Sequence, residues 1–408
     1  MEKEEYVIDV VGGVYLERCM QPSWLEVYGS GGRAASALAR MGAEVRLHSY
    51  ISEANKEAIE SRAALEGFLL NATQINKGCS FHYTHGLDNP TINLPLDDYA
   101  DIQINAERVV KFGLIEGDAV VKATFAVYDP QNVTDPASFR ANGSTATHLA
   151  LVLNRYEAAV MCKRMDLDIS EIAALLASQE QAEIVVIKMG PSGALIYDKG
   201  EIGLVPAFST NHVWKIGSGD TFVAHFAYQW MQQGLAAIEA ARLASKATAF
   251  YCENAGFPSK ASLERFDPPP IVPSSRFKNG YSPMVYIAGP FFTLNQLWLV
   301  EQIMNNLRDM GLQIFSPYHD VGHGSADDVV QKDLEAIDKC DLMFAIGDAM
   351  DPGTIYEIGY ARAKGKPVIM YCENESSGDK KMMEGSGCIL CSDYVTAIYK
   401  TLWTAISL

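Results

Sequence analysis

Short apolar segments rich in β-branched residues alternate with segments of helical periodicity along most of the chain. In the first half, the runs YVIDVVGG, AEVRLHSYI, HLALVLN and AEIVVIKMG predict strands, and GGRAASALARMG predicts a helix ending at Gly42. This alternation is typical of layered α/β proteins. The segment from Cys79 to Pro95 (CSFHYTHGLDNPTINLP) alternates with a shorter period and predicts a β-hairpin or small sheet outside the main layer.

A second α/β series follows a proline-rich segment. Residues 266–283 (FDPPPIVPSSRFKNGYSP) contain five prolines and no helical or strand period, so we interpret them as a semi-rigid linker. Beyond it, MVYIAGP, LQIFSP, DLMFAIGD and KPVIMYC predict strands separated by helices. Short crossovers between apolar strands favour a parallel sheet. Because 408 residues exceed the size of a single core, we predict two domains, 1–265 and 284–408.

Composition narrows the classes of function. The formal charge of −17 argues against a nucleic-acid partner, which needs a basic surface. No apolar run approaches the roughly 20 residues that cross a bilayer, and the acidic start MEKEEY does not resemble a signal peptide. The eight cysteines are scattered through apolar stretches, which is typical of reduced, core-filling thiols. We therefore expect a cytoplasmic protein without a membrane or nucleic-acid partner.

Candidate chemistry in the second series gathers where its predicted strands end. Ligands of parallel sheets lie beyond the carboxyl ends of the strands. That edge receives the following candidates from three strand ends and two helices: Tyr286, Gly289, Pro290, Ser316, Pro317, Asp333, Asp348, Asp351, Gly353 and Glu357. Each carboxylate alone has a simpler interpretation, as a solvated helix residue, a cap, or a match to the helix dipole. Their convergence on one edge favours an active site.

The motifs YIAGPFF, DLEAIDKCDLMFAIGD and DPGTIYEIGYARAKGKPVI resemble the nucleoside 2-deoxyribosyltransferase family over nearly all of 283–408. The resemblance implies a flavodoxin-like fold and a double displacement at C1′ of a 2′-deoxyribonucleoside, without a cofactor. It makes Glu357 the nucleophile, which a helix N-terminus would keep ionised. It assigns Asp333 and Asp351 to the base and its proton, and Tyr286 to positioning Glu357 and the sugar.

Two departures leave alternatives open for this half. Lys381 replaces the asparagine that usually precedes a Met pair and reaches a neighbouring subunit's sugar, although the family still implies a homo-oligomer. A related branch hydrolyses deoxynucleoside 5′-monophosphates with a Ser and an Arg after the first strand, where this chain has Pro290-Phe291-Phe292. An apolar mouth suits a nucleoside better than a phosphate. The alternative to a transferase is thus a deoxynucleoside or deoxynucleoside 5′-monophosphate N-glycosidase.

In the first half, KIGSGDTF (residues 215–222) is a glycine-rich turn that opens a helix. Successive amides in such a turn bind anions, and Asp220 can accept the proton of an attacking hydroxyl there. The simpler interpretation is a helix N-cap at Ser218 or Asp220.

Three further motifs, GSGGRAASALARMG, LVLNRYEA and VIKMGPSG, make this half similar to the ribokinase (PfkB carbohydrate/nucleoside kinase) family over residues 6–256. The resemblance implies an α/β sandwich with a small β lid that includes Cys79–Pro95, and ATP as phosphoryl donor. It makes Asp220 the base and the turn Gly217-Ser218-Gly219 the anion hole. Asn154 and Glu157 become the Mg²⁺–phosphate motif, with Glu157 acting on the metal indirectly.

The acceptor side departs from the family pattern. Glu17 stands where an aspartate binds sugar hydroxyls, Ser36 replaces the asparagine after Gly31-Gly32, and Val213-Trp214 replaces a common Asp-Thr pair.

We predict a bifunctional enzyme of nucleoside metabolism that acts on nucleosides, sugars and free nucleobases. The alternative is a catalytically silent kinase-like half that binds nucleosides or supports assembly.

Overall fold

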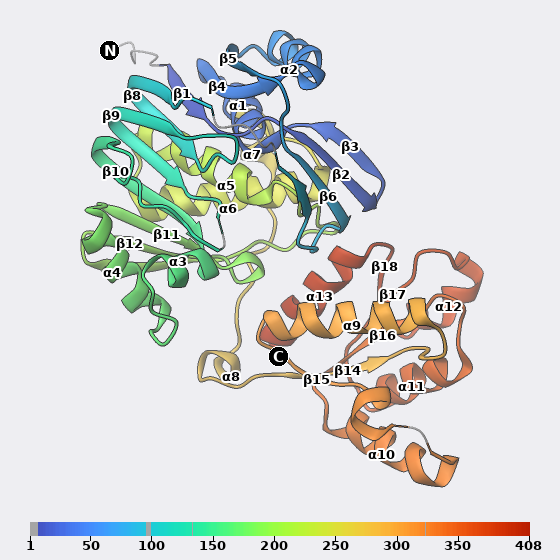
Figure 1. Ribbon diagram of the computed structural model, residues 1–408. Helices are drawn as coiled ribbons and strands as arrows, with labels where there is room; N and C mark the ends of the chain where they lie inside the picture. The colour runs from blue at the N-terminus through green and yellow to red at the C-terminus, as the bar shows by residue number, and fades with distance from the viewer. Residues whose placement is uncertain (1–6, 95–98, 133, 323) are drawn as a thin grey trace. The chain divides into compact units, whose positions relative to one another are not determined.

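In the computed structural model, which describes residues 7–94, 99–132, 134–322 and 324–408, the chain divides into two units (Figure 1). They comprise Met1–Pro270 and Ile271–Leu408, so the division falls inside the proline-rich segment 266–283. That segment includes a helical turn, α8 (Ser275–Lys278), which the linker prediction did not contain. Ser274 caps it by accepting a hydrogen bond from the Phe277 amide, which supplies a partner for an otherwise unpaired donor.

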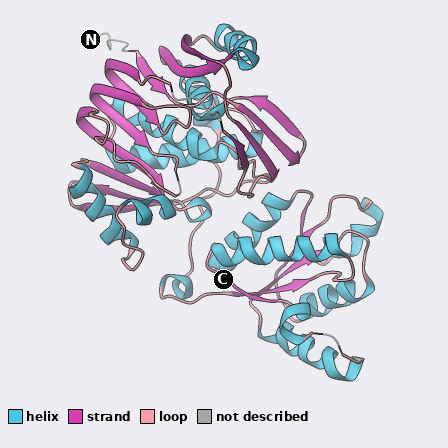
Figure 2. Cartoon of the chain, viewed as in Figure 1, coloured by secondary structure: helices cyan, strands magenta, loops and turns pink. Residues whose placement is uncertain are grey.

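Nine strands of the first unit form one sheet (Figure 2). Its order is β13-β12-β11-β10-β9-β8-β1-β4-β5, with parallel pairing from β5 to β11 and antiparallel pairing of β12 and β13. The strands are β1 (Ile8–Val11), β4 (Val45–Ser52), β5 (Leu69–Ile75), β8 (Ile102–Phe112), β9 (Ala119–Asp129), β10 (Thr145–Asn154), β11 (Ile184–Lys188), β12 (Ala194–Asp198) and β13 (Glu201–Val205).

Helices cover both faces of this sheet and enclose two hydrophobic cores. One face packs against α1 (Gly29–Arg40), α2 (Glu53–Glu66), α5 (Ser218–Ala227), α6 (Ala237–Asn254) and α7 (Lys260–Arg265). The other face packs against α3 (Arg155–Met161) and α4 (Ile169–Glu180). Burial on both faces explains why the central strands read as continuous apolar runs.

A separate four-stranded sheet stands beside the large one (Figure 1). It consists of β3 (Trp24–Val27), β2 (Leu16–Gln21), β6 (Ser80–His85) and β7 (Thr91–Asn93), in that order. The β6–β7 pair is antiparallel and forms the hairpin predicted for this stretch. Pro95, the last residue of the predicted segment, lies outside the described residues.

The second unit is a five-stranded, fully parallel sheet of order β15-β14-β16-β17-β18. Numbered from its first strand, the order is 2-1-3-4-5, the flavodoxin-like arrangement. The predicted fold class is therefore confirmed for both halves. The elements are β14 (Met284–Ala288), α9 (Leu294–Asp309), β15 (Gln313–Phe315), α10 (Ala326–Lys339), β16 (Leu342–Ile346), α11 (Pro352–Ala363), β17 (Val368–Tyr371), α12 (Ser377–Gly385), β18 (Ile389–Cys391) and α13 (Tyr394–Ser407).

All eight cysteines are buried and free, as the sequence predicts. They fill space among apolar side chains rather than cross-linking the chain. Of the helices that the structure describes, none combines the length and apolar character that crossing a bilayer requires.

Two neighbouring glycines at the start of α1 allow a matched test of how closely this helix approaches β1. A Cβ atom on Gly31 would lie 2.6 Å from the Gly12 carbonyl oxygen, whereas one on Gly32 would meet nothing nearer than 3.5 Å. We expect Gly31→Ala to lower the free energy of unfolding by about 1–3 kcal/mol because backbone must move. Gly32→Ala should be neutral or stabilising by up to about 1 kcal/mol. Denaturant unfolding measures both, and equal effects would contradict the close approach.

Candidate active sites

The second unit brings Tyr286 and Glu357 into contact. Alternation along β14 directs Tyr286 toward the face covered by α10 and α11, where it belongs to their shared core. Glu357 lies on α11, one turn beyond the Pro352-Gly353 start of the helix. The phenol of the buried Tyr286 donates a hydrogen bond of 2.8 Å to Glu357 Oε1. A strand residue thus orients the carboxylate that the family resemblance predicts to be the nucleophile.

Burial has the largest effect on the ionisation of Glu357. Desolvation raises the pKa of this carboxyl from 4.5 to about 7, the Tyr286 hydrogen bond opposes the rise, and nearby Asp333 and Asp351 add to it. The helix N-terminus was expected to keep Glu357 ionised. The balance instead leaves the group divided between its two protonation states near neutral pH.

Asp333 supplies a second carboxyl group in the same place. It lies on α10, and its Oδ1 atom is buried without a hydrogen-bond partner among the described residues. Burial raises the pKa of Asp333, while neighbouring Lys332 lowers it. A partly desolvated carboxyl group with an unused oxygen can hold a proton and deliver it to a ligand.

Asp351 caps helix α11 and also lies near Glu357. It is the N-cap of α11, and its Oδ2 atom accepts hydrogen bonds from the Thr354 amide (2.8 Å) and hydroxyl (2.9 Å). The capping interpretation therefore holds for this oxygen, while the charge of Asp351 still acts on Glu357. Gly353 is exposed in the first turn of the same helix.

The glycine-proline pair after β14 is buried. A Cβ on Gly289 would approach Ile346, the last residue of β16, to 2.9 Å. Strands β14 and β16 are neighbours where the strand order reverses, which is where ligands bind in such sheets. Gly289 and Pro290 therefore lie at the predicted edge.

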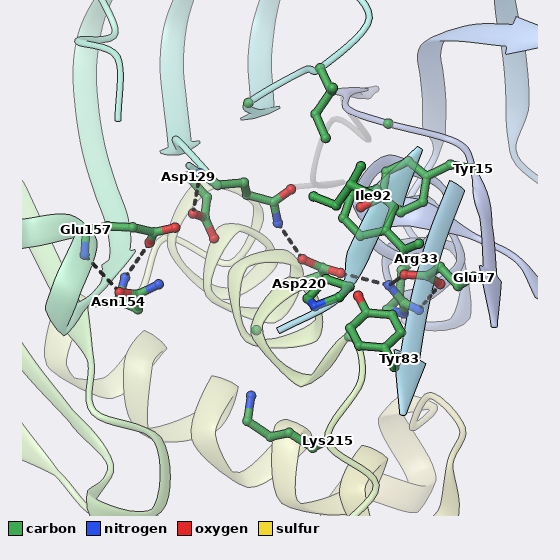
Figure 3. Close-up of a pocket in the computed structure, with 18 of the residues that line it drawn as sticks. Tyr15, Glu17, Arg33, Tyr83, Ile92, Asp129, Asn154, Glu157, Lys215 and Asp220 are labelled. Carbon is green, nitrogen blue, oxygen red and sulfur yellow. Dashed lines mark hydrogen bonds and ion pairs between the residues drawn. The ribbon is translucent and has the colours of Figure 1, made fainter. Parts of the chain in front are cut away.

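The first unit contains a cavity of about 400 Å³ (Figure 3). The residues that line it come from both sheets, from β10–α3, and from the turn before α5: Gly13, Tyr15, Glu17, Arg33, Phe81, Tyr83, Pro90, Ile92, Gly113, Ile115, Glu116, Asp129, Gln131, Asn154, Glu157, Lys188, Lys215, Gly217, Gly219 and Asp220. Its rim combines aromatic rings from the small sheet with charged groups from the large one.

Both carboxylate oxygens of Asp220 are engaged. Oδ2 accepts a hydrogen bond from Arg33 (2.9 Å) and Oδ1 accepts one from the Gln131 amide (2.6 Å). The same guanidinium pairs with Glu17, so Arg33 bridges the predicted base and the predicted acceptor-binding residue (Figure 3). Arg33 and Glu17 are 1% and 2% exposed, so both charges of this ion pair are removed from water.

Arg33 also lies against the predicted anion hole. Gly217 has φ = +76°, and a Cβ there would fall 1.9 Å from Arg33 Nε, so only glycine fits. Gly217 and Gly219 line the cavity. Ser218 is buried at the start of α5, and its hydroxyl accepts a 3.1 Å hydrogen bond from Lys215. Burial lowers the pKa of Lys215.

Asn154 and Glu157 form a capping box at the start of α3. Asn154 Oδ1 accepts from the Glu157 amide, and Glu157 Oε2 accepts from the Asn154 amide. Both residues also line the cavity, as does Asp129, which is ion-paired with Lys188. Mg²⁺ in phosphate sites is held by one or two carboxylates together with the phosphates. Glu157 and Asp129 fit that donor set, although no cluster of three potential ligands occurs among the described residues.

Several residues of this cavity were not predicted from the sequence. Gly31 and Gly32, which the sequence predicts to bind the substrate, lie in the first turn of α1 and are not among the residues that line the cavity. Their neighbours Gly13 and Arg33 line it instead. Among the others that the prediction missed are Tyr15, Tyr83, Asp129, Gln131, Lys188 and Lys215. Asp129 ends β9 and Lys188 ends β11, the strands on either side of β10 in the parallel part of the sheet, and the ends of parallel strands are where candidate ligand residues lie. Arg33 carries no comparable signal, because a basic residue in a helix is ordinary.

Two family models match separate parts of the chain. Residues 132–261 match the model described as pfkB family carbohydrate kinase, and residues 285–389 match the model described as Nucleoside 2-deoxyribosyltransferase. The two family resemblances are confirmed. No curated protein matches the chain at the level of sequence.

Solved structures agree on the fold of the first unit. The chain is similar to fructokinase from Vibrio cholerae O395 in fructose-, ADP- and calcium-bound form, with 14% identity and a TM-score of 0.51 over 64% of this chain and 99% of that one. It is also similar to a double mutant of that enzyme with potassium ion bound, with 14% identity and a TM-score of 0.52 over 65% and 99%. The first unit therefore has a ribokinase-like fold.

The raised pKa of Glu357 has a consequence for stability. The folded state holds this proton up to about pH 7, but the unfolded chain releases it near 4.5, so wild-type stability falls as pH rises between these values. We expect Glu357→Gln to stabilise the second unit by about 1–3 kcal/mol at pH 8 and by less at pH 5.

Hydrogen–deuterium exchange of the slowest amides in β14 and β16 of the full chain measures this difference. Glu335→Gln is the matched control, because Glu335 is an exposed carboxylate on α10. A Glu357→Gln effect that is the same at pH 5 and pH 8 would contradict the raised pKa.

Proposed function

We propose that the second unit breaks and re-forms the N-glycosidic bond of 2′-deoxyribonucleosides. The single observation that carries the proposal is the 2.8 Å hydrogen bond from Tyr286 to Glu357, made beside Asp333 at the reversal point of a parallel sheet. Carboxylates paired in this way suit displacement at an anomeric carbon with oxocarbenium character. The match to the deoxyribosyltransferase family supports the same sugar class.

The reaction requires one carboxylate and one carboxylic acid. An ionised Glu357 attacks C1′ and forms a glycosyl ester, while the C1′–N bond breaks and its electron pair passes to the base. Asp333, whose pKa is raised by burial, gives its proton to that nitrogen, and Asp351 contacts the base. A nitrogen of a second base then attacks C1′ and gives its proton to Asp333, while the C1′–O ester bond breaks and its electron pair returns to Glu357 as the free carboxylate. The Tyr286 hydrogen bond favours the ionised form of Glu357 before attack.

For the first unit we propose phosphoryl transfer from ATP to a sugar or nucleoside hydroxyl. Gly217 and Gly219 line the cavity at the N-terminus of α5, where backbone amides can hold phosphoryl oxygens. Lys188 and Lys215 add positive charge, and Glu157 with Asp129 would hold Mg²⁺, which neutralises phosphate charge when bound. Asp220 accepts the hydroxyl proton once the acceptor replaces one of its present partners.

One observation favours the silent-module alternative for this unit. Arg33 and Gln131 occupy both oxygens of Asp220, and Arg33 also occupies Glu17, so the acceptor side of the cavity is already paired. In this alternative, the unit would bind a nucleoside or support assembly without using Asp220 as a base. The two possibilities differ in one measurable quantity, ATP turnover in the presence of acceptors.

The fusion would join two reactions in which the product of one unit is a substrate of the other. If the second unit releases a free deoxysugar, the first can trap it as a phosphate ester.

We also propose a cytoplasmic homo-oligomer. Lys381 and Met382 are exposed on α12, the helix that the family uses to complete a neighbour's site.

Base exchange distinguishes a transferase from a hydrolase. With deoxyinosine and adenine, we expect the wild-type chain to form deoxyadenosine, and Glu357→Gln to lower this rate at least about 10³-fold because no ester can form. Asp333→Asn should lower it by about 10²–10⁴-fold. Chromatography of the nucleosides provides the measurement, with Glu335→Gln as the control. Deoxyribose and hypoxanthine without deoxyadenosine would identify an N-glycosidase instead.

ATP turnover tests the first unit. With Mg²⁺-ATP and a panel of ribose, deoxyribose and nucleosides, we expect phosphorylated product from the wild type and a loss of about 10²–10⁴-fold in Asp220→Asn. Asp166→Asn is the control, since Asp166 is exposed away from the cavity lining. Nucleotide binding without turnover of any acceptor would establish the silent module.

A further inference from the structure

A second, smaller hollow of about 210 Å³ lies in the first unit, and aromatic rings form most of its wall. Four large rings, each only half-buried, converge there, together with the buried Tyr251. The lining comes from β3, α2, the turn before α5 and the end of α6: Trp24, Glu26, Tyr28, Arg62, Trp214, Tyr251, Ala255 and Phe257. The larger cavity has none of these residues in its lining.

The rings are held in fixed orientations around the hollow. Trp24 and Trp214 meet edge to face at 5.2 Å between centroids. Tyr251 and Phe257 stack at 5.3 Å, and Phe257 meets Tyr28 edge to face at 6.1 Å. Rings from distant parts of the chain rarely leave a hollow of this kind open to solvent, because closing it would bury more apolar area.

The polar groups of the hollow exclude one common occupant of aromatic boxes, a quaternary ammonium. The Arg62 guanidinium lies 3.7 Å from the centroid of Tyr28, and the Arg33 guanidinium lies 5.2 Å from the same ring. The carboxylate of Glu26 is paired with Arg62 at 2.9 Å. The protein's own cations therefore use the negative charge and the π-face that a cationic ligand would need.

An unused donor defines what the ligand must carry. Arg62 Nε is buried, and no described residue accepts a hydrogen bond from it. Arg62 lines the hollow, and Nε reaches a ligand there when the guanidinium turns; a ligand edge that then accepts its hydrogen bond removes the cost of the unpaired donor. The volume is below the roughly 300 Å³ at which drug-sized pockets begin, so a single flat ring system suits it better than a larger molecule.

We infer that this hollow is a binding site for a free nucleobase, a flat heteroaromatic ring that stacks on the Trp24, Trp214 and Phe257 rings and accepts a hydrogen bond from Arg62. Base–aromatic stacking is worth about 1–3 kcal/mol per base. The inference stands on the hollow alone. A free base is also the co-product of the glycosyl reaction proposed for the other unit.

The site is placed to affect the larger cavity. Tyr251 donates a 2.8 Å hydrogen bond to the carbonyl of Ile216, the residue before Gly217 of the anion hole. The Trp214 amide donates to the Cys252 carbonyl in the same region. A base bound between these rings therefore touches the turn that presents the anion hole.

Fluorine NMR of the full chain labelled with 5-fluorotryptophan tests the inference at residue level. The chain has five tryptophans, whose resonances can be assigned with single Trp→Phe variants. On titration with adenine, we expect saturable shifts of the Trp24 and Trp214 signals, with no saturable shift of Trp230, which lies in the core beneath the large sheet. Arg62→Lys should weaken adenine binding about tenfold through loss of the edge donor.

Variants of one ring separate binding from folding. Trp24→Phe keeps an aromatic face and should retain the Trp214 shift, whereas Trp24→Leu should lose it while circular dichroism stays unchanged. Three results would each overturn the inference: unshifted Trp24 and Trp214 signals with adenine, hypoxanthine and thymine; a response to tetramethylammonium in place of the bases; or tighter binding of deoxyadenosine than of adenine. None of these results depends on turnover by either unit.

Discussion

The carboxylate of Glu357 is held between two opposing effects, and the chemistry that we propose for the second unit depends on their balance. Burial beside Asp333 and Asp351 favours the protonated form, and the hydrogen bond from Tyr286 favours the ionised form. A fully solvated glutamate would be ionised but surrounded by competing water. A glutamate buried without the tyrosine would stay protonated and could not attack. The strand-to-helix contact between β14 and α11 sets this balance, and the order of the parallel sheet places both elements at its reversal point.

The first unit resolves a similar problem in another way. Its carboxylates are buried with a permanent cation, since Arg33 pairs with both Glu17 and Asp220 inside the wall of the cavity. Removing one partner of such a cluster leaves an uncompensated charge. In the proposed kinase reaction, an acceptor would therefore compete with Arg33 and Gln131 for Asp220 before phosphoryl transfer. This competition would link specificity for the acceptor to activation of the proposed base.

Much of this organisation could be predicted from the sequence, for identifiable reasons. The alternating strands and helices, the 79–95 hairpin and the second parallel sheet follow from hydrophobic period and short crossovers. The convergence of Tyr286, Asp333 and Glu357 follows from the rule that parallel strands end at one edge. The Arg33 bridge could not be predicted, because it joins residues 16 and 187 positions away through contacts that only folding creates. The same is true of the aromatic hollow, whose lining comes from four separate elements, and of the pKa of Glu357, which depends on burial.

The most direct test of the central claim is a mass-spectrometric search for the glycosyl ester. After rapid acid quenching of the full chain with deoxyinosine, we expect a peptide carrying one deoxyribosyl group on Glu357, with no adduct in Glu357→Gln. Efficient glycosidic cleavage with no adduct on Glu357, or with the adduct on another residue, would contradict the account.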